Sequence, residues 1–256
     1  MAIHSDSLVV LGAGWLGKAL CLQAQQQGWQ VQGTHRSNQH QLDFQRQLRL
    51  DNGQLSHQLD LTDAWWVCCI TPGSRHKQSD YAATLAASLQ LAKQLHCKGF
   101  LLCSSTGVYN QASAVYDENS VIDDRSPRQQ KLYAAEQQVL NAGGKVLRLA
   151  GLLGPNREPG RFVAGKQLTS SSQQVVNMVH QADVISAIFT VLSNWQRADP
   201  IYNIVNPAHP TKAVYYQQKC QLQGTTMPEF TSDEKAERII DGSAIESLGF
   251  RYQYTI

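Results

Sequence analysis

The sequence predicts an α/β protein built on a doubly wound parallel sheet with a small C-terminal lobe. Strand-like and helix-like segments alternate through the first two-thirds of the chain, as in a parallel sheet covered on both faces. A glycine-rich turn joins the first strand to the first helix. The composition, with 42% hydrophobic and 16% charged residues, is typical of a globular protein, and 256 residues suffice for one large and one small domain.

Apolar, β-branched runs predict the strands, and helical periodicity of apolar residues predicts the helices. In chain order we expect strands at 8–11, 30–34, 55–61, 65–70, 99–104 and 145–149, and helices from 18 onward, at 81–95 and at 129–140. A polar stretch, 36–47, follows the second strand. After Gly151 the alternation loosens, and we expect a helix at 182–192, a strand at 201–205 and a helix at 213–222.

The glycine-rich turn has the spacing G-x-G-x-x-G, with Trp15 and Leu16 between the second and third glycines. Gly12 permits the tight turn, Gly14 lets the backbone approach a pyrophosphate, and Gly17 lets the helix pack closely on the strand. The helix that follows presents its N-terminus to the phosphates. We therefore expect residues 1–150 to form a Rossmann-type NAD(P)-binding domain and residues 151–256 a smaller substrate-binding lobe, interleaved with the last strands of the sheet.

The end of the second predicted strand favours NADP as the cofactor, with NAD as the alternative. An NAD-selective site carries Asp or Glu about twenty residues past the glycines, to hold the ribose 2′-hydroxyl. Here the strand runs through Thr34, His35 and Arg36, and the first acid is Asp43. A guanidinium matches phosphate oxygens in a bidentate way, so Arg36 can pair with a 2′-phosphate, and His35 could assist. The alternative interpretation makes Arg36 a solvated loop cation.

Further cofactor contacts are expected at the ends of the later strands. Asp60 and Leu61 would sit beside the adenine. The ribose and pyrophosphate side would be lined by Ile70, Thr71 and Pro72, and Ser104 ends the fifth strand near the cofactor.

Further segments follow in a fixed order: CSSTGVY at 103–109, LRLAGLLGP at 147–155, NMVHQAD at 177–183 and IYNI at 201–204. With the glycine turn, they resemble the extended short-chain dehydrogenase/reductase family, in its NAD-dependent epimerase/dehydratase group. The segments PGRFVAGK at 159–166, NPAHP at 206–210 and DGS at 241–243 are similar to compact, atypical bacterial members. The resemblance is more specific for the fold than for an activity.

The resemblance implies a Ser or Thr that binds the substrate oxygen, a Tyr as acid/base, and a Lys four residues after it. Ser105 matches the first position. In one alignment register Tyr133 is the tyrosine and Gln137 stands at the lysine position; in another, Arg128 and Leu132 occupy the two positions. Both registers lose the lysine. Arg128 could stabilise an oxyanion but cannot act as a base at neutral pH.

Basic residues of the C-terminal lobe are candidates for substrate binding. Arg157, Arg161 and Lys166 lie among glycines and would cap an anionic substrate group. Equally, this segment could be a lid whose charges face water.

The net charge, the apolar runs and the cysteine spacing argue against several classes of protein. A net charge of +2 without a basic run argues against nucleic acid, and no apolar run approaches the length of a membrane span. The N-terminus lacks the features of a signal peptide, so we expect a cytoplasmic protein. The six cysteines lack metal or redox spacing and are interpreted as reduced thiols, and no metal is expected.

Two functions remain open at this point. The first is an NADP-linked oxidoreductase or epimerase/dehydratase-like enzyme that acts on a small carbonyl or sugar-like substrate. The second is a catalytically silent NAD(P)-binding sensor or scaffold, since the Tyr-x-x-x-Lys pair is missing. By analogy with the family, the helices at 81–95 and 129–140 would form a homodimer.

Overall fold

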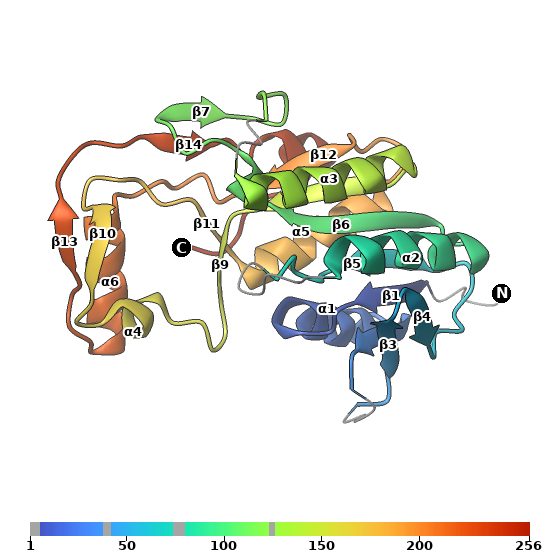
Figure 1. Ribbon diagram of the computed structural model, residues 1–256. Coiled ribbons are helices and arrows are strands. Elements are labelled where there is room, and N and C mark those ends of the chain that lie inside the picture. The colour runs from blue at the N-terminus through green and yellow to red at the C-terminus, as the bar shows by residue number, and fades with distance from the viewer. Residues whose placement is uncertain (1–5, 38–41, 74–79, 123–125) are drawn as a thin grey trace. The chain divides into compact units, whose positions relative to one another are not determined.

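An eight-stranded, largely parallel sheet organises the protein, which confirms the predicted fold class (Figure 1). The computed structural model describes residues 6–37, 42–73, 80–122 and 126–256. The strand order is β12-β8-β6-β5-β1-β2-β3-β4, and the pairs β3–β2, β2–β1, β1–β5 and β5–β6 are parallel. From β1 the chain first moves outward through β2 and β3, and later returns to the other side of β1 as β5. The fold is therefore of the Rossmann type, with its topological switch point between β1 and β5.

Most predicted elements are present, with ends shifted by a few residues. The strands of the large sheet are β1 (Ser7–Leu11), β2 (Gln30–His35), β3 (Gln45–Asp51), β4 (Gln54–His57), β5 (Trp65–Cys68), β6 (Gly99–Ser105), β8 (Lys145–Leu149) and β12 (Ile201–Ile204). The helices are α1 (Trp15–Gln26), α2 (Tyr81–Gln94), α3 (Pro127–Asn141), α4 (Pro159–Val163), α5 (Gln181–Ser193) and α6 (Lys212–Gln223). Two short 3-10 helices, η1 (Thr106–Val108) and η2 (Ala244–Leu248), also occur among the described residues.

Alternating residues of β1 show why the sheet is covered on both faces. Val9 and Leu11 are fully buried in a core that includes Leu85 of α2 and Val139 of α3. Val10 points to the opposite face, where its Cγ1 would lie 3.0 Å from a Cβ on Gly17 of α1. A strand that is buried on both faces needs a continuous apolar run, and Leu8 to Leu11 supply it.

The region around residues 36–61 differs from the prediction. The polar stretch contains β3, and the strand expected at 55–61 is the shorter β4, which runs antiparallel to β3. β4 is largely exposed at the edge of the sheet, so it has no apolar run to reveal it. Asp60 follows this strand instead of ending it.

The chain divides into two compact units, each described here by itself. Unit 1 comprises Met1–Val108, Asp124–Leu147 and Leu192–Ile201; unit 2 comprises Tyr109–Asp123, Arg148–Val191 and Tyr202–Ile256. Unit 2 contains three two-stranded ladders, which pair β7 (Ala114–Tyr116) with β14 (Arg238–Ile240), β9 (Gly151–Leu153) with β11 (Met178–His180), and β10 (Gln167–Ser171) with β13 (Glu229–Ser232). Within the described ranges, no helix is long and apolar enough to cross a membrane.

Candidate active site

The glycine turn after β1 has the geometry of a phosphate-binding turn. Gly12 has a φ of +83°, and its N–H donates to Thr34 Oγ1 at 2.9 Å. The next N–H, of Ala13, donates to the Thr34 carbonyl at 2.8 Å. A Cβ on Gly17 would lie 2.3 Å from the Gly12 carbonyl oxygen, so α1 can pack this closely only with glycine there. Thr34 therefore braces the turn through its side chain and its backbone.

The space beside Gly14 is open, as the binding of a dinucleotide pyrophosphate at this turn requires. A Cβ on Gly14 would meet no atom of the described residues within 4 Å. Gly14 is the N-cap of α1, and no side chain in the described part of the protein caps this end. Trp15 and Leu16 form its first turn. An uncapped helix N-terminus beside open space favours an anionic ligand.

The end of β2 presents one exposed cation next to a fixed histidine. Arg36 is exposed, and its carbonyl accepts from Gln47 Nε2 at 3.2 Å. Gln45 Oε1 accepts from the Leu42 N–H, so the Gln45 amide nitrogen is the atom 2.9 Å from His35 Nε2. That ring nitrogen must therefore accept, which puts the imidazole proton on Nδ1.

Buried Gln32 of β2 holds the segment after β4. Its side-chain nitrogen donates to Asp60 Oδ1, and its side-chain oxygen accepts from the N–H groups of Asp60 and Leu61 at 3.1 and 3.3 Å. The sequence analysis did not identify Gln32. A glutamine between Val31 and Gly33 in the middle of the predicted strand could have signalled it, because a buried polar side chain needs a hydrogen-bond partner.

The segment after β5 closes the other side of the glycine turn. A Cβ on Gly12 would lie 3.0 Å from Ile70 Cγ1 and 3.1 Å from the Ile70 nitrogen. Thr71 is exposed and Pro72 is half-buried directly after it. Ile70 is thus the residue of this predicted group that packs on the glycine turn.

Ser104 is directed into the protein, toward α3. Its hydroxyl donates to Glu136 Oε1 at 2.5 Å, and the Glu136 side chain is fully buried. This bond joins β6 to the middle of α3. The Ser104 side chain is therefore committed to Glu136 in this structure.

Ser105 and Arg128 meet at η1, directly after β6. Ser105 Oγ accepts from the Gly107 N–H at 3.1 Å, which leaves its hydroxyl hydrogen as a donor. A Cβ on Gly107 would lie 3.2 Å from Ser105 Oγ and 3.5 Å from Arg128 Nη2. The absence of a side chain at Gly107 thus lets the Ser105 hydroxyl and the Arg128 guanidinium approach the same point. We call this site the corner at Gly107.

The same face of α3 carries Arg128, Leu132 and Glu136, at intervals of four residues. Leu132 Cδ1 lies 3.7 Å from the Cβ position of Gly107, and Glu136 binds Ser104. Tyr133 follows Leu132 and is rotated by about 100° around the helix axis, away from this face. It is half-buried. Arg128 and Leu132, the two residues of the second register, therefore lie on one face of α3 with Glu136, and the choice between the two registers stays a prediction.

The three basic residues predicted to bind substrate lie in α4 and its flanks. Arg161 Nε lies 2.5 Å from Glu158 Oε2, and Lys166 Nζ lies 4.2 Å from the ring centre of exposed Phe162. The Arg157 N–H donates to the Gly154 carbonyl at 3.0 Å, and burial lowers the pKa of its guanidinium. Substrate binding by these three residues remains a prediction.

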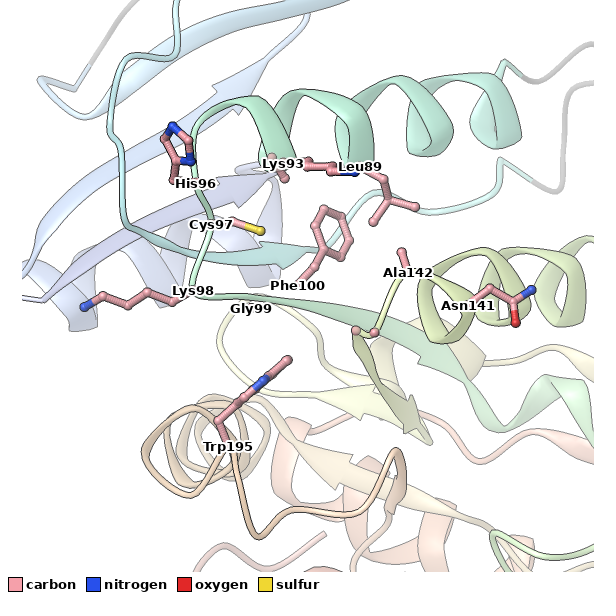
Figure 2. A pocket seen from close by; sticks show the side chains of 13 residues that line it. Leu89, Lys93, His96, Cys97, Lys98, Gly99, Phe100, Asn141, Ala142 and Trp195 are labelled. Atoms are coloured by element: carbon pink, nitrogen blue, oxygen red, sulfur yellow. The ribbon is translucent and has the colours of Figure 1, made fainter.

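A cavity of about 570 Å³ lies near the amino end of β6, whereas the glycine turn lies at the carboxyl ends of the strands (Figure 2). Gly99 begins β6 there, and the ends of α2 and α3 close the sides. Figure 2 shows Phe100, Leu89 and Trp195 around it and Lys98 pointing away, toward its ion pair with Asp6 at 2.9 Å. Dinucleotides bind outside the carboxyl ends of the strands, so this cavity is separate from the candidate active site.

A glycine turn of this geometry at the switch point of a Rossmann-type sheet defines a dinucleotide-binding protein. The chain belongs to the NAD-dependent epimerase/dehydratase family, whose model matches residues 8–205. Protein YeeZ of Escherichia coli strain K12 is 35% identical over 265 residues, covering 96% of both chains.

Solved structures share the fold. MoeE5 in complex with UDP-glucose and NAD superposes with a TM-score of 0.81 at 18% identity, covering 98% of this chain and 95% of that one. The dTDP-glucose 4,6-dehydratase of Bacillus anthracis, in complex with NAD, gives a TM-score of 0.76 at 17% identity, with coverage of 98% and 93%. At this identity they show the fold alone.

Proposed function

We propose that this protein is an NADP-dependent oxidoreductase or epimerase/dehydratase-like enzyme that acts on a small carbonyl or sugar-like substrate. The observation that carries the proposal is the corner at Gly107, where Ser105 Oγ and Arg128 Nη2 lie within 3.5 Å of one point. MoeE5 and the Bacillus anthracis dehydratase, which share the fold, are complexes with NAD, and MoeE5 also holds UDP-glucose. These complexes support a nicotinamide dinucleotide and a sugar-like substrate here.

The residues of the corner have complementary tasks. A bound nicotinamide dinucleotide supplies the hydride chemistry. The Ser105 hydroxyl donates a hydrogen bond to the substrate oxygen. The Arg128 guanidinium stabilises the negative charge that develops on that oxygen. Arg128 keeps its proton at neutral pH, so it orients and stabilises without acting as the acid or base. Leu132, in the place of a lysine, keeps this face of α3 free of a second cation.

Replacing Ser105 by alanine is expected to lower kcat/KM by roughly 100-fold, since one donor to the developing charge is lost. A panel of aldehydes, ketones and UDP-sugars, with NADPH or NADP⁺ supplied, identifies the substrate for this assay. Arg128→Ala should cause a loss of similar size, while dinucleotide affinity stays unchanged in both variants. Ser56→Ala on exposed β4 and Lys131→Ala on the exposed face of α3 are the controls. Unchanged rates in Ser105→Ala and Arg128→Ala would remove both residues from the mechanism.

The exposed Arg36 at the end of β2 supports a preference for NADP. Arg36→Ala is expected to weaken NADPH binding by roughly 10- to 100-fold, because charge-assisted hydrogen bonds to the 2′-phosphate are lost, and to leave NADH binding nearly unchanged. Titration of nicotinamide fluorescence measures both affinities. Arg49→Ala, an exposed arginine of β3 paired with Asp51, is the matched control for net charge. Equal losses for the two cofactors would contradict the assignment of Arg36.

A catalytically silent dinucleotide sensor is the second candidate. It is favoured by Leu132 at the lysine position and by Tyr133 on another face of α3. Tight NADPH binding without turnover across the panel would select this function over the enzyme.

A further inference from the structure

Two cysteines face each other at the carboxyl ends of β5 and β6. The parallel register of these strands pairs Cys68 with Leu102, so the next step along it brings Cys69 opposite Cys103. Their Sγ atoms are 3.9 Å apart. Neighbouring strands lie about 4.8 Å apart, inside the Cα separation of roughly 4.4–6.8 Å that disulfides tolerate. The pair can therefore be joined by a local movement that closes the sulfurs by roughly 2 Å.

The other cysteines differ from this pair in burial or position. Cys69 and Cys103 are both half-buried, whereas Cys21 and Cys68 are fully enclosed. Cys97 is also half-buried, but it precedes β6 and lines the cavity near the amino end of that strand (Figure 2). A small oxidant that reaches the carboxyl ends of β5 and β6 thus meets Cys69 and Cys103 together.

The backbone at Cys69 is tied directly to the glycine turn. The Cys69 N–H donates to the Leu11 carbonyl at 2.8 Å, immediately before Gly12. The carbonyl carbon of Cys69 would lie 3.3 Å from a Cβ on Gly12, and Ile70 packs still closer. Any shift of Cys69 toward Cys103 is therefore transmitted to the turn that receives the pyrophosphate.

We propose that Cys69 and Cys103 are a modification site, which a peroxide oxidises to an intramolecular disulfide that weakens dinucleotide binding. One thiol of the pair loses its proton and attacks the peroxide, the O–O bond breaks, and a sulfenic acid and one water form, the water taking up the proton. The second thiol then attacks the sulfenic sulfur, its proton leaves with the displaced hydroxyl as the second water, and the S–S bond forms. In total the two thiols lose two protons and two electrons, which the peroxide accepts. The effect on binding rests on the proposed function; the disulfide itself does not.

The resting protein carries this pair in its reduced form. The S–H contact with Cys103, followed by burial, raises the pKa of Cys69, so this thiol keeps its proton near neutral pH. A disulfide between these two half-buried residues remains accessible to a thiol reductant, so the modification is reversible.

Mass spectrometry of the full chain tests the disulfide. After treatment with hydrogen peroxide and alkylation of the remaining thiols, we expect a linkage between the peptides that contain Cys69 and Cys103, with no added oxygen. Cys69→Ser and Cys103→Ser should each abolish this linkage, while Cys68→Ser and Cys97→Ser should retain it. Oxygen adducts on unlinked cysteines, or a linkage that persists in Cys69→Ser, would overturn the proposal.

Titration with NADPH tests the effect on binding. The oxidised protein should bind about tenfold more weakly than the reduced protein, a coupling of ordinary size, and dithiothreitol should restore the affinity. The Cys103→Ser variant should bind NADPH with the same affinity before and after peroxide treatment. A linkage that forms without a change in affinity would overturn the coupling to the glycine turn. If the reduced protein binds neither NADPH nor NADH, the proposed function fails, while the mapped linkage still decides the modification.

Discussion

Gly17→Ala is expected to destabilise the protein by about 3 kcal/mol, which corresponds to a fall in Tm of roughly 6–12 °C. The reason is steric. The new Cβ would lie 2.3 Å from the Gly12 carbonyl oxygen and 3.0 Å from Val10 Cγ1, so the start of α1 must move away from β1. A backbone oxygen in a tight turn cannot give way as a flexible side chain can.

Gly14→Ala should separate binding from folding. The added methyl group meets no described atom within 4 Å and the Gly14 φ is negative, −78°, so Tm should fall much less than in Gly17→Ala. The methyl group would instead fill the space of the pyrophosphate and weaken NADPH binding by roughly 10- to 100-fold, as overpacking of about 1–3 kcal/mol does. Thermal melts and fluorescence titrations on both variants give the comparison. Wild-type affinity in a folded Gly14→Ala protein would show that the turn does not hold the cofactor.

The sequence predicts the central elements because their signals are local. Leu8 to Leu11 are apolar and buried on both faces of the sheet, which a contiguous run reveals. Helix α3 begins at Pro127 because Ser126 caps it and Gln129 closes the capping box. The turn at Gly12 to Gly17 is likewise encoded within a few residues.

Pairings between distant residues leave no such signal. The ladder of β7 and β14 pairs Ala114 with Arg238, and each strand has only three residues, too short for a period-2 pattern. At the site, Ser104 reaches Glu136 and Cys69 reaches Cys103 across 32 and 34 residues. Residue types identify the candidates in these cases, and the sheet order decides which of them meet.

Tyr109→Phe is expected to cost roughly 3 kcal/mol of folding free energy, although it removes a single oxygen. The Tyr109 hydroxyl accepts from Arg148 Nη1 at 2.8 Å and donates to Asn203 Oδ1 at 2.8 Å. All three side chains are at most 2% exposed, so water cannot replace the lost bonds, and one of the partners is a charged guanidinium. Denaturant unfolding measures the loss.

Tyr116→Phe is the matched control for this change. Its ring centre lies 5.5 Å from that of Tyr109, so both phenols share one environment, but its hydroxyl bonds only to the Ala112 carbonyl among the described interactions. We expect a loss of about 1 kcal/mol there. Equal losses in the two variants would mean that the Arg148–Tyr109–Asn203 chain adds nothing beyond one ordinary hydrogen bond.

The same phenol makes stability depend on alkaline pH. Burial, opposed in part by Arg148, raises the pKa of Tyr109, and burial also raises the pKa of Tyr215 and Tyr252. An unfolded tyrosine titrates near 10, so below that pH both states are protonated and the contribution to stability is constant. As the pH rises above about 10, the unfolded chain loses its phenol protons first, and the free energy of unfolding falls. Tyr109→Phe should therefore reduce the slope of this alkaline fall, as measured by denaturant unfolding of the variant and the wild type between pH 8 and 11.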